Sequence, residues 1–201
     1  MRWDRFFDDL EDQLASEWEA ERAALDTEAE RLRLSRVALR ERLQALARRD
    51  PASSAPTFEF TDGTILAAEV SGVGADWAAL QPLERRAAAV VAPLHGIGCV
   101  GVPHPDLLRS ARPGEEASTL SDRMTFGFVL RDLVRRRTGV VLHLAHGRVL
   151  TGTIDRAGAD HLDIALHDEG AARRSNDVTG HRMVPFAAVS WIRVAAASVL
   201  A

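Results

Sequence analysis

The feature that most constrains this chain is an internal repeat, because two of its segments carry the same pattern 84 positions apart. Gly63 aligns with Gly147, and the triplet Gly-Ala-Asp follows at both 74–76 and 158–160. Apolar and polar residues alternate before each of the two glycines. Chance accounts poorly for a shared glycine, a shared alternation and a shared triplet together. The sequence therefore predicts a duplication of one small unit.

Each copy has the sequence pattern of a series of short strands. Asp62-Gly63 and His146-Gly147 predict tight hairpin turns, because glycine accepts a positive φ. Further apolar runs after each turn bring the expected number of strands to about five per copy, as in small barrels. The pattern predicts two small, strongly bent, five-stranded β-barrels in tandem. We expect them to pack against each other, with Trp77 or Trp191 near the contact, because exposed strand edges invite association.

The N-terminal quarter of the chain has a different composition. Residues 2–49 contain no Gly and no Pro and are rich in good helix formers, and Asp50-Pro51 ends the pattern. The sequence therefore predicts one long amphipathic helix over residues 1–50. One face of this helix repeats every seven residues and forms a candidate pairing seam: Trp18, Leu25, Leu32, Leu39 and Leu46. This spacing favours a coiled coil with a protein partner or a second copy, and the alternative is a helix lying on its own domain.

Charge is unevenly distributed along this expected helix. Residues 1–30 carry eleven acidic side chains and three arginines, whereas residues 31–50 carry seven arginines and two acidic side chains. An antiparallel partner places the acidic half on the basic half, and a parallel partner places like charges together. The pattern therefore favours antiparallel pairing, although each exposed ion pair contributes little.

The composition divides the chain into four segments. The fold class expected is α+β, with a long N-terminal helix followed by two tandem barrels. A short helix over residues 124–137 is expected to lead into the second barrel. The four expected segments are the helix at 1–50, the first barrel at 51–102, a linker at 103–122, and the short helix with the second barrel at 123–201.

The second copy carries a recognisable run of motifs. A short helix precedes a strand ending at Gly147, then comes Leu150-Thr-Gly-Thr-Ile154, and a closing strand ends near Ile192. This run resembles the Sm-like small barrels, a family that includes the bacterial Hfq RNA chaperone. The resemblance covers about residues 125–194, and through the repeat it extends more weakly to 57–102. It implies a small five-stranded barrel of the Sm or SH3 type, with RNA as a family ligand.

Two departures bear on the RNA ligand that the resemblance implies. The family uses an asparagine in the third strand, where this chain has Asp163 and, in the first copy, Ala79. The Lys-His pair that Hfq-type proteins carry before the last strand is replaced by residues 183–185, Met-Val-Pro. A carboxylate repels phosphate, so the resemblance implies the fold more than it implies RNA binding.

Charge argues in the same direction. The formal net charge is −4, so strongly cationic nucleic-acid binding is not expected. Five arginines are candidate contacts for a protein partner or a nucleic acid: Arg135, Arg136, Arg137, Arg173 and Arg174. The first three close the short helix, where cations are also favoured by the helix dipole. The last two lie in a loop, 171–178, that is inserted in the second copy and is expected to be exposed.

No sequence signature of catalysis or cofactor binding is present, so we expect a protein that is not an enzyme and holds no cofactor and no metal. Cys99 lies among apolar residues and is expected to be inert core. His143 is expected to face solvent, with His146 in a turn. No run of residues is apolar enough to span a bilayer, and no signal-peptide core is seen, so the expected location is cytoplasmic.

Together these observations predict a cytoplasmic adaptor or regulatory protein that is not an enzyme. It is expected to bind protein partners through its tandem copies, and to oligomerise or dock through its N-terminal helix. The alternative is an Sm-like regulator that binds RNA or DNA.

Overall fold

The structure is a computed structural model that describes residues 18–19, 21–23, 25–49, 54–84, 87–112, 120–170, 174 and 176–195. The chain divides into two compact units, Met1–Ala38 and Leu39–Ala201. The first unit contributes helix, seen at residues 25–35 and at the described positions before them. The second unit holds the sheet, its helices and both clusters of buried apolar side chains.

The single helix predicted over residues 1–50 is wrong, and so is the coiled coil predicted from it. The helix of the first unit ends at residue 35, residues 36–38 are not helical, and α2 (Leu39–Ala47) begins anew. Tertiary contacts override the continuous helical pattern here, because Leu43 and Leu46 of α2 are buried in the core of the second unit. The alternative, a helix lying on its own domain, holds for α2.

The second unit is built on one antiparallel sheet of ten strands, in the order β5-β1-β2-β3-β4-β10-β6-β7-β8-β9. The strands are β1 (Thr57–Phe60), β2 (Ile65–Val73), β3 (Trp77–Pro82), β4 (Val90–Pro93), β5 (Ile97–Gly101), β6 (Gly139–Leu144), β7 (Val149–Ala157), β8 (His161–Leu166), β9 (Gly180–Pro185) and β10 (Val189–Val194). The prediction of two closed five-stranded barrels is therefore wrong. Neither half closes on itself, because β4 pairs with β10 of the other half.

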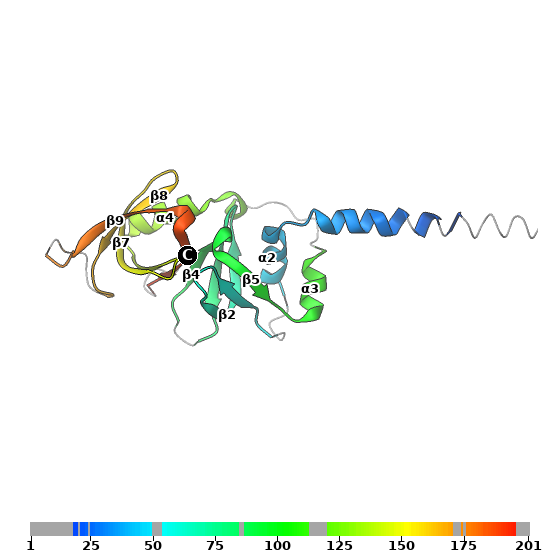
Figure 1. Cartoon of the computed structure of the whole chain (residues 1–201), viewed down its shortest axis with the longest axis horizontal. Helices are drawn as coiled ribbons and strands as arrows, with labels where there is room; N and C mark the ends of the chain where they lie inside the picture. The colour runs from blue at the N-terminus through cyan, green and yellow to red at the C-terminus, as the bar shows by residue number, and fades with distance from the viewer. Residues whose placement is uncertain are drawn as a thin grey trace, which may run out of the picture. The chain divides into compact units, whose positions relative to one another are not determined.

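Short helices connect and cover these strands (Figure 1). Besides α2 they are α3 (His104–Ser110) and α4 (Phe126–Arg136), with 3-10 turns η1 (Leu94–Gly96), η2 (Ser121–Arg123) and η3 (Phe186–Ala188). The predicted short helix before the second copy is thus present as α4. The segment predicted as a linker at 103–122 instead contains α3, which lies beside α2.

The predicted repeat appears as two halves of the sheet with the same order of elements. The first half runs from α2 through β1–β5 and the second from α4 through β6–β10, with a 3-10 turn before the last strand of each. The hairpin glycines match, since Gly63 has φ 83° and Gly147 has φ 85°. The Asp76 carbonyl accepts from the Leu94 N–H at 2.8 Å, and the Asp160 carbonyl accepts from the Phe186 N–H at 2.7 Å.

The two halves are joined side by side through their edge strands. Strand β4 pairs with β10 in the register Val91 to Ile192 and Val90 to Arg193. The cores interlock across this junction, because Trp77 packs with the second half and Trp191 packs with the first. The indole N–H of Trp191 donates to the Asp62 carboxylate at 3.0 Å. The two copies therefore meet near Trp77 and Trp191, as parts of one sheet.

Candidate functional site

Strand β5 is one of the two outer edges of the sheet, since β1 is its only strand neighbour within the described residues. Its sequence, Ile-Gly-Cys-Val-Gly, carries no charge. Gly98 and Gly101 are exposed. An uncharged, exposed edge strand offers backbone N–H and C=O groups for pairing with another chain.

Cys99 lies on this edge and is exposed, so its predicted place in the core is wrong. Its thiol donates to a carboxylate oxygen of Glu59 on β1, at 3.3 Å. This hydrogen bond raises the pKa of the Cys99 thiol above its ordinary value. A thiol that stays protonated is a poor nucleophile, so the site offers little cysteine chemistry.

A cavity of about 150 Å³ lies beside β5, between this strand and the helices α2 and α3. We call it the β5 groove. Its lining is mostly apolar: Leu39, Arg42, Leu43, Leu46, Ile97, Gly98, Cys99, Val100, Val102, Leu107 and Ser110. Two of its leucines are partly open to solvent, Leu39 at 43% and Leu107 at 42%. The groove therefore offers an apolar surface next to an unpaired strand edge.

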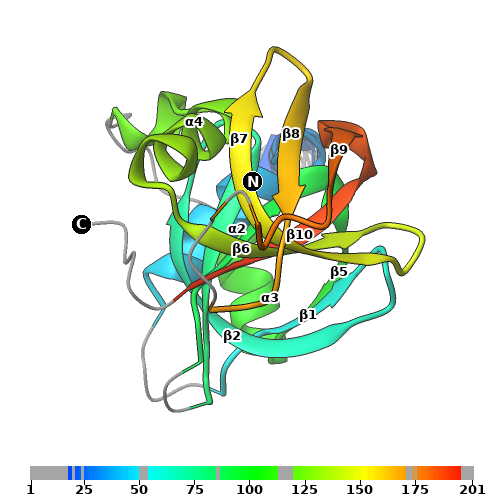
Figure 2. The ribbon, with the colours of Figure 1, turned by 90° about the vertical axis from the view of Figure 1, so that its left-hand side faces the viewer.

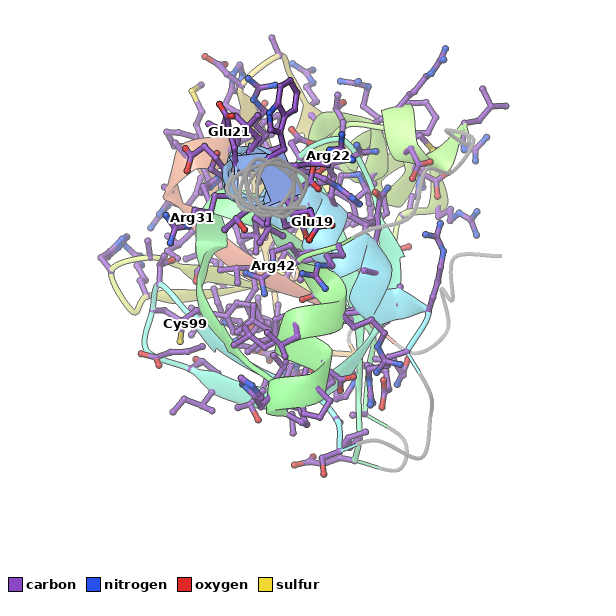
Figure 3. All side chains as sticks on the ribbon, turned by 90° about the vertical axis from the view of Figure 1, so that its right-hand side faces the viewer. Glu19, Glu21, Arg22, Arg31, Arg42 and Cys99 are labelled. Atoms are coloured by element: carbon purple, nitrogen blue, oxygen red, sulfur yellow. The ribbon has the colours of Figure 1, made fainter. Side chains whose placement is uncertain are left out.

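Arg42 is the charged side chain of this lining, and it is held in place by α3. Its guanidinium donates to the Leu107 carbonyl at 2.9 Å and to the Ser110 hydroxyl at 3.1 Å. Figure 3 labels Arg42 beside α3 and Cys99 on the neighbouring strand. These bonds tie α2 to α3, which are two of the three segments that line the groove.

The chemistry available in the groove is that of binding. Among the described residues no three His, Cys, Asp or Glu side chains gather where they could hold a metal ion. The groove itself contains no carboxylate and no imidazole. Apolar contact and backbone hydrogen bonds are what this arrangement supplies.

Of the five predicted arginine contacts, the four that the structure describes are not part of the groove lining. Arg135 and Arg136, at the end of α4, both bind the carboxylate of Asp132, in the second case at 2.7 Å. Arg137 ends the helix in the left-handed region with φ 51°. Arg174 is exposed, and Arg173 lies outside the described residues. The charges of Arg135 and Arg136 are thus partly neutralised within α4.

The structure separates the residues of the predicted helix seam. Trp18, Leu25 and Leu32 are exposed on the first unit, at 68%, 65% and 51%. Leu39 lines the β5 groove, and Leu46 is buried in the core. The groove has no contiguous signal in the sequence, because its walls come from three separate segments. The uncharged Ile97–Gly101 run was the one local signal of an unprotected edge.

A second hollow, of about 400 Å³, lies on the strands at the other end of the sheet. Figure 2 shows these strands, β7, β8 and β9, side by side. The lining mixes both signs of charge: Asp155, Arg156, Asp163, His181, Arg182 and Met183. The two carboxylates oppose the binding of phosphate, so this surface is a weaker candidate than the β5 groove.

A third cluster lies where the two halves meet, around His143 on β6. The prediction that His143 faces solvent is wrong, because its ring stacks on Trp191 with 3.6 Å between ring centroids. Its Nδ1 lies 3.5 Å from the Asp62 carboxylate. Burial lowers the pKa of His143 below its ordinary 6.5, and nearby Arg193 acts in the same direction, while Asp62 opposes them. This cluster holds the junction together and lines neither hollow.

None of the helices in the described part of the chain combines the length and the apolar character needed to cross a membrane. In comparisons with protein families, with curated proteins and with solved structures, nothing matches this chain.

Proposed function

We propose that this protein is an adaptor that is not an enzyme and that binds a partner protein in the β5 groove. The observation that carries the proposal is the uncharged outer edge of β5, which pairs with no strand in the described part of the chain and lies directly beside an apolar groove. Monomeric proteins usually protect edge strands with charge, proline or a covering element. An uncharged edge that has no second strand neighbour among the described residues, next to apolar surface, is typical of a surface that another chain covers.

The energetics of the groove agree with protein binding. Leu39 and Leu107 remain about two-fifths exposed in the free protein. Burying a leucine side chain fully, relative to leaving it exposed, contributes about 1.5–3 kcal/mol. Arg42 stays bound to α3, so a partner need not displace this side chain on entering. The groove is thus preorganised for an apolar side chain.

Nucleic-acid binding is the second candidate function. It was suggested by the resemblance to Sm-like proteins, and that resemblance stays a prediction. Asp132 binds Arg135 and Arg136, which weakens the strongest basic cluster predicted from the sequence. Docking or self-association through the exposed Trp18, Leu25 and Leu32 also stays a prediction. Filter binding of a nucleic acid at several salt concentrations separates nucleic-acid binding from protein binding, because phosphate contacts give an affinity that falls steeply with salt.

The adaptor proposal is tested by two matched substitutions on α3. Leu107→Asp places a carboxylate in the groove, whereas Leu108→Asp places one on a leucine that is 57% exposed and outside the groove lining. Partners are identified by proximity labelling in the native host with wild type and both variants. We expect proteins that are lost with Leu107→Asp and retained with Leu108→Asp, and little change in Tm for either variant. The same set of proteins for all three chains would rule the proposal out.

A further inference from the structure

We infer that the outer edge of β5 takes an extended segment of a partner protein as an added antiparallel strand, in the register with which β10 takes β4. This inference rests on the proposed function and specifies the chemistry of the partner. The added segment is apolar, as β4 is at the junction. One of its apolar side chains enters the β5 groove.

The internal junction of this chain shows how such an edge is filled. β5 and β10 are equivalent, since each is the last strand of its half and each pairs with the first strand of that half. On β5, Val100 pairs with Phe58, and on β10, Ile192 pairs with Leu142. The other edge of β10 is occupied by β4, whereas the other edge of β5 has no strand among the described residues. β10 with β4 is therefore a template for β5 with its partner.

The template also identifies the backbone groups that would bind. At the junction the Val194 N–H donates to the Ala89 carbonyl at 2.9 Å. Alternate residues of an antiparallel strand turn their N–H and C=O groups to the same side, so the backbone N–H and C=O groups of Ile192 also point to β4. The equivalent residues in the first half are Val102 and Val100. Within the described part of the chain, nothing accepts a hydrogen bond from the Val102 N–H.

The register places one partner side chain in the groove. Directly opposed residues of neighbouring strands point to the same face of a sheet. Val91 of β4 lies opposite Ile192, so the equivalent partner residue lies opposite Val100. Val100 lines the β5 groove, together with Leu107 from α3. An apolar side chain opposite Val100 therefore enters the groove.

The strand that fills the junction, β4, and its equivalent at the far edge, β9, differ in a way that selects the partner. β4 is fully buried and apolar, with the sequence Val-Val-Ala-Pro. β9, which holds the equivalent position at the far edge, exposes His181 and Arg182. Charged side chains on an edge strand oppose pairing. A second copy offering β9 would bring Arg182 to the place that Val90 holds at the junction. We therefore assign the site to an apolar segment of a different protein.

The direct test uses the β4 segment of this chain as a free peptide. The probe is the blocked peptide of residues 87–95, Ala-Ala-Ala-Val-Val-Ala-Pro-Leu-His, added to the full-length protein. Binding is followed by fluorescence polarisation, and amide exchange is measured by NMR. We expect saturable binding with new protection of the Val100 and Val102 amides. A peptide carrying Val91→Asp is expected to lose binding, because its carboxylate would enter the apolar groove.

A matched pair of protein variants tests the predicted hydrogen bond. Val102→Pro removes the outward N–H, and Val102→Thr keeps both the N–H and the branched side chain. We expect Val102→Pro to weaken peptide binding about tenfold, the upper range for one backbone hydrogen bond, and Val102→Thr to leave it nearly unchanged. Far-UV circular dichroism and Tm establish that both variants are folded.

The outcomes separate this inference from the proposed function. Suppose that Leu107→Asp loses partners but the peptide does not bind, or protects only amides of β9 from exchange. Either result would overturn strand addition and leave the adaptor proposal intact. Dimerisation of the wild type that Val102→Pro abolishes would show that the edge takes a second copy, which also overturns the assignment. Partners insensitive to Leu107→Asp would remove the proposed function itself.

Discussion

At the scale of single residues, the junction cluster shows how folding changes the chemistry of a side chain. In the sequence His143 alternates with Leu142 and Leu144, which predicts an outward-facing ring. In the fold that outer face is covered by Trp191, whose ring lies within 14° of parallel to the imidazole. Asp62 comes from the hairpin of the other half and accepts from Trp191 at 3.0 Å. A surface histidine thereby becomes a partly buried one.

The lowered pKa of His143 predicts a pH dependence of stability. Between its lowered folded value and the ordinary 6.5, the unfolded chain binds more protons at this position than the folded chain does. The free energy of unfolding therefore falls as the pH falls below about 6.5. We expect His143→Phe, which keeps a flat ring against Trp191, to flatten this slope. Urea unfolding between pH 5 and 8 measures it, and an equal slope in the variant would contradict the prediction.

At the scale of elements, α2 shows why a helix cannot be placed from its periodicity alone. Leu43 and Leu46 continue the apolar pattern of the residues before them, but they pack on the sheet. The end of α2 is held by Arg49, whose buried guanidinium forms an ion pair with Glu69 on β2. Arg40 donates to the Gly74 carbonyl at 2.8 Å. α2 is thus a part of the sheet domain.

The packing of α2 predicts a clear difference between two leucines of the same helix. Leu43 is fully buried and Leu39 is 43% exposed. We expect Leu43→Ala to lower the free energy of unfolding by about 2–5 kcal/mol, because it removes buried contacts and leaves a cavity. Leu39→Ala should cost less than about 1 kcal/mol. Denaturant unfolding compares the two, and equal losses would mean that α2 does not pack as described.

At the scale of the whole molecule, the β4·β10 junction makes the two halves of the sheet one cooperative body. Val91 is fully buried, and although it belongs to β4 it packs in the core cluster of the second half. Trp191 belongs to β10 and packs in the cluster of the first half. Each half therefore completes the core of the other, and neither is expected to unfold alone.

This interlocking predicts one unfolding transition for the sheet domain. We expect far-UV circular dichroism and tryptophan fluorescence to give coincident urea curves. Val91→Asp buries an unpaired charge and should lower amide protection in β7 of the second half as well as in β2 of the first. Native-state hydrogen exchange measures both strands. Two separate transitions, or loss of protection in one half alone, would show that the halves fold independently.

Local signals in the sequence accounted for much of the secondary structure. Asp62-Gly63 and His146-Gly147 form the predicted turns, because a positive φ is a property of one residue and its neighbours. The sequence also predicted α4, which depends on one short continuous pattern. It predicted the repeat because the same short patterns occur in both copies. The candidate site was not recognised, because its walls on α2, β5 and α3 lie far apart in the chain.

What the sequence determined by itself is the set of local elements, their turns and their duplication. The tertiary structure alone decided how the two halves pair with each other, where the N-terminal helix ends, and which outer strand of the described sheet adjoins an apolar groove. Strand pairing is set by backbone hydrogen bonds that every residue except proline can make, so the pairing of β4 with β10 leaves little trace in the residues that form it. The burial of His143 depends on Trp191, which lies opposite it on β10, and the exposure of Cys99 on its place in the outer strand β5, because burial depends on what covers a side chain and only weakly on the side chain itself.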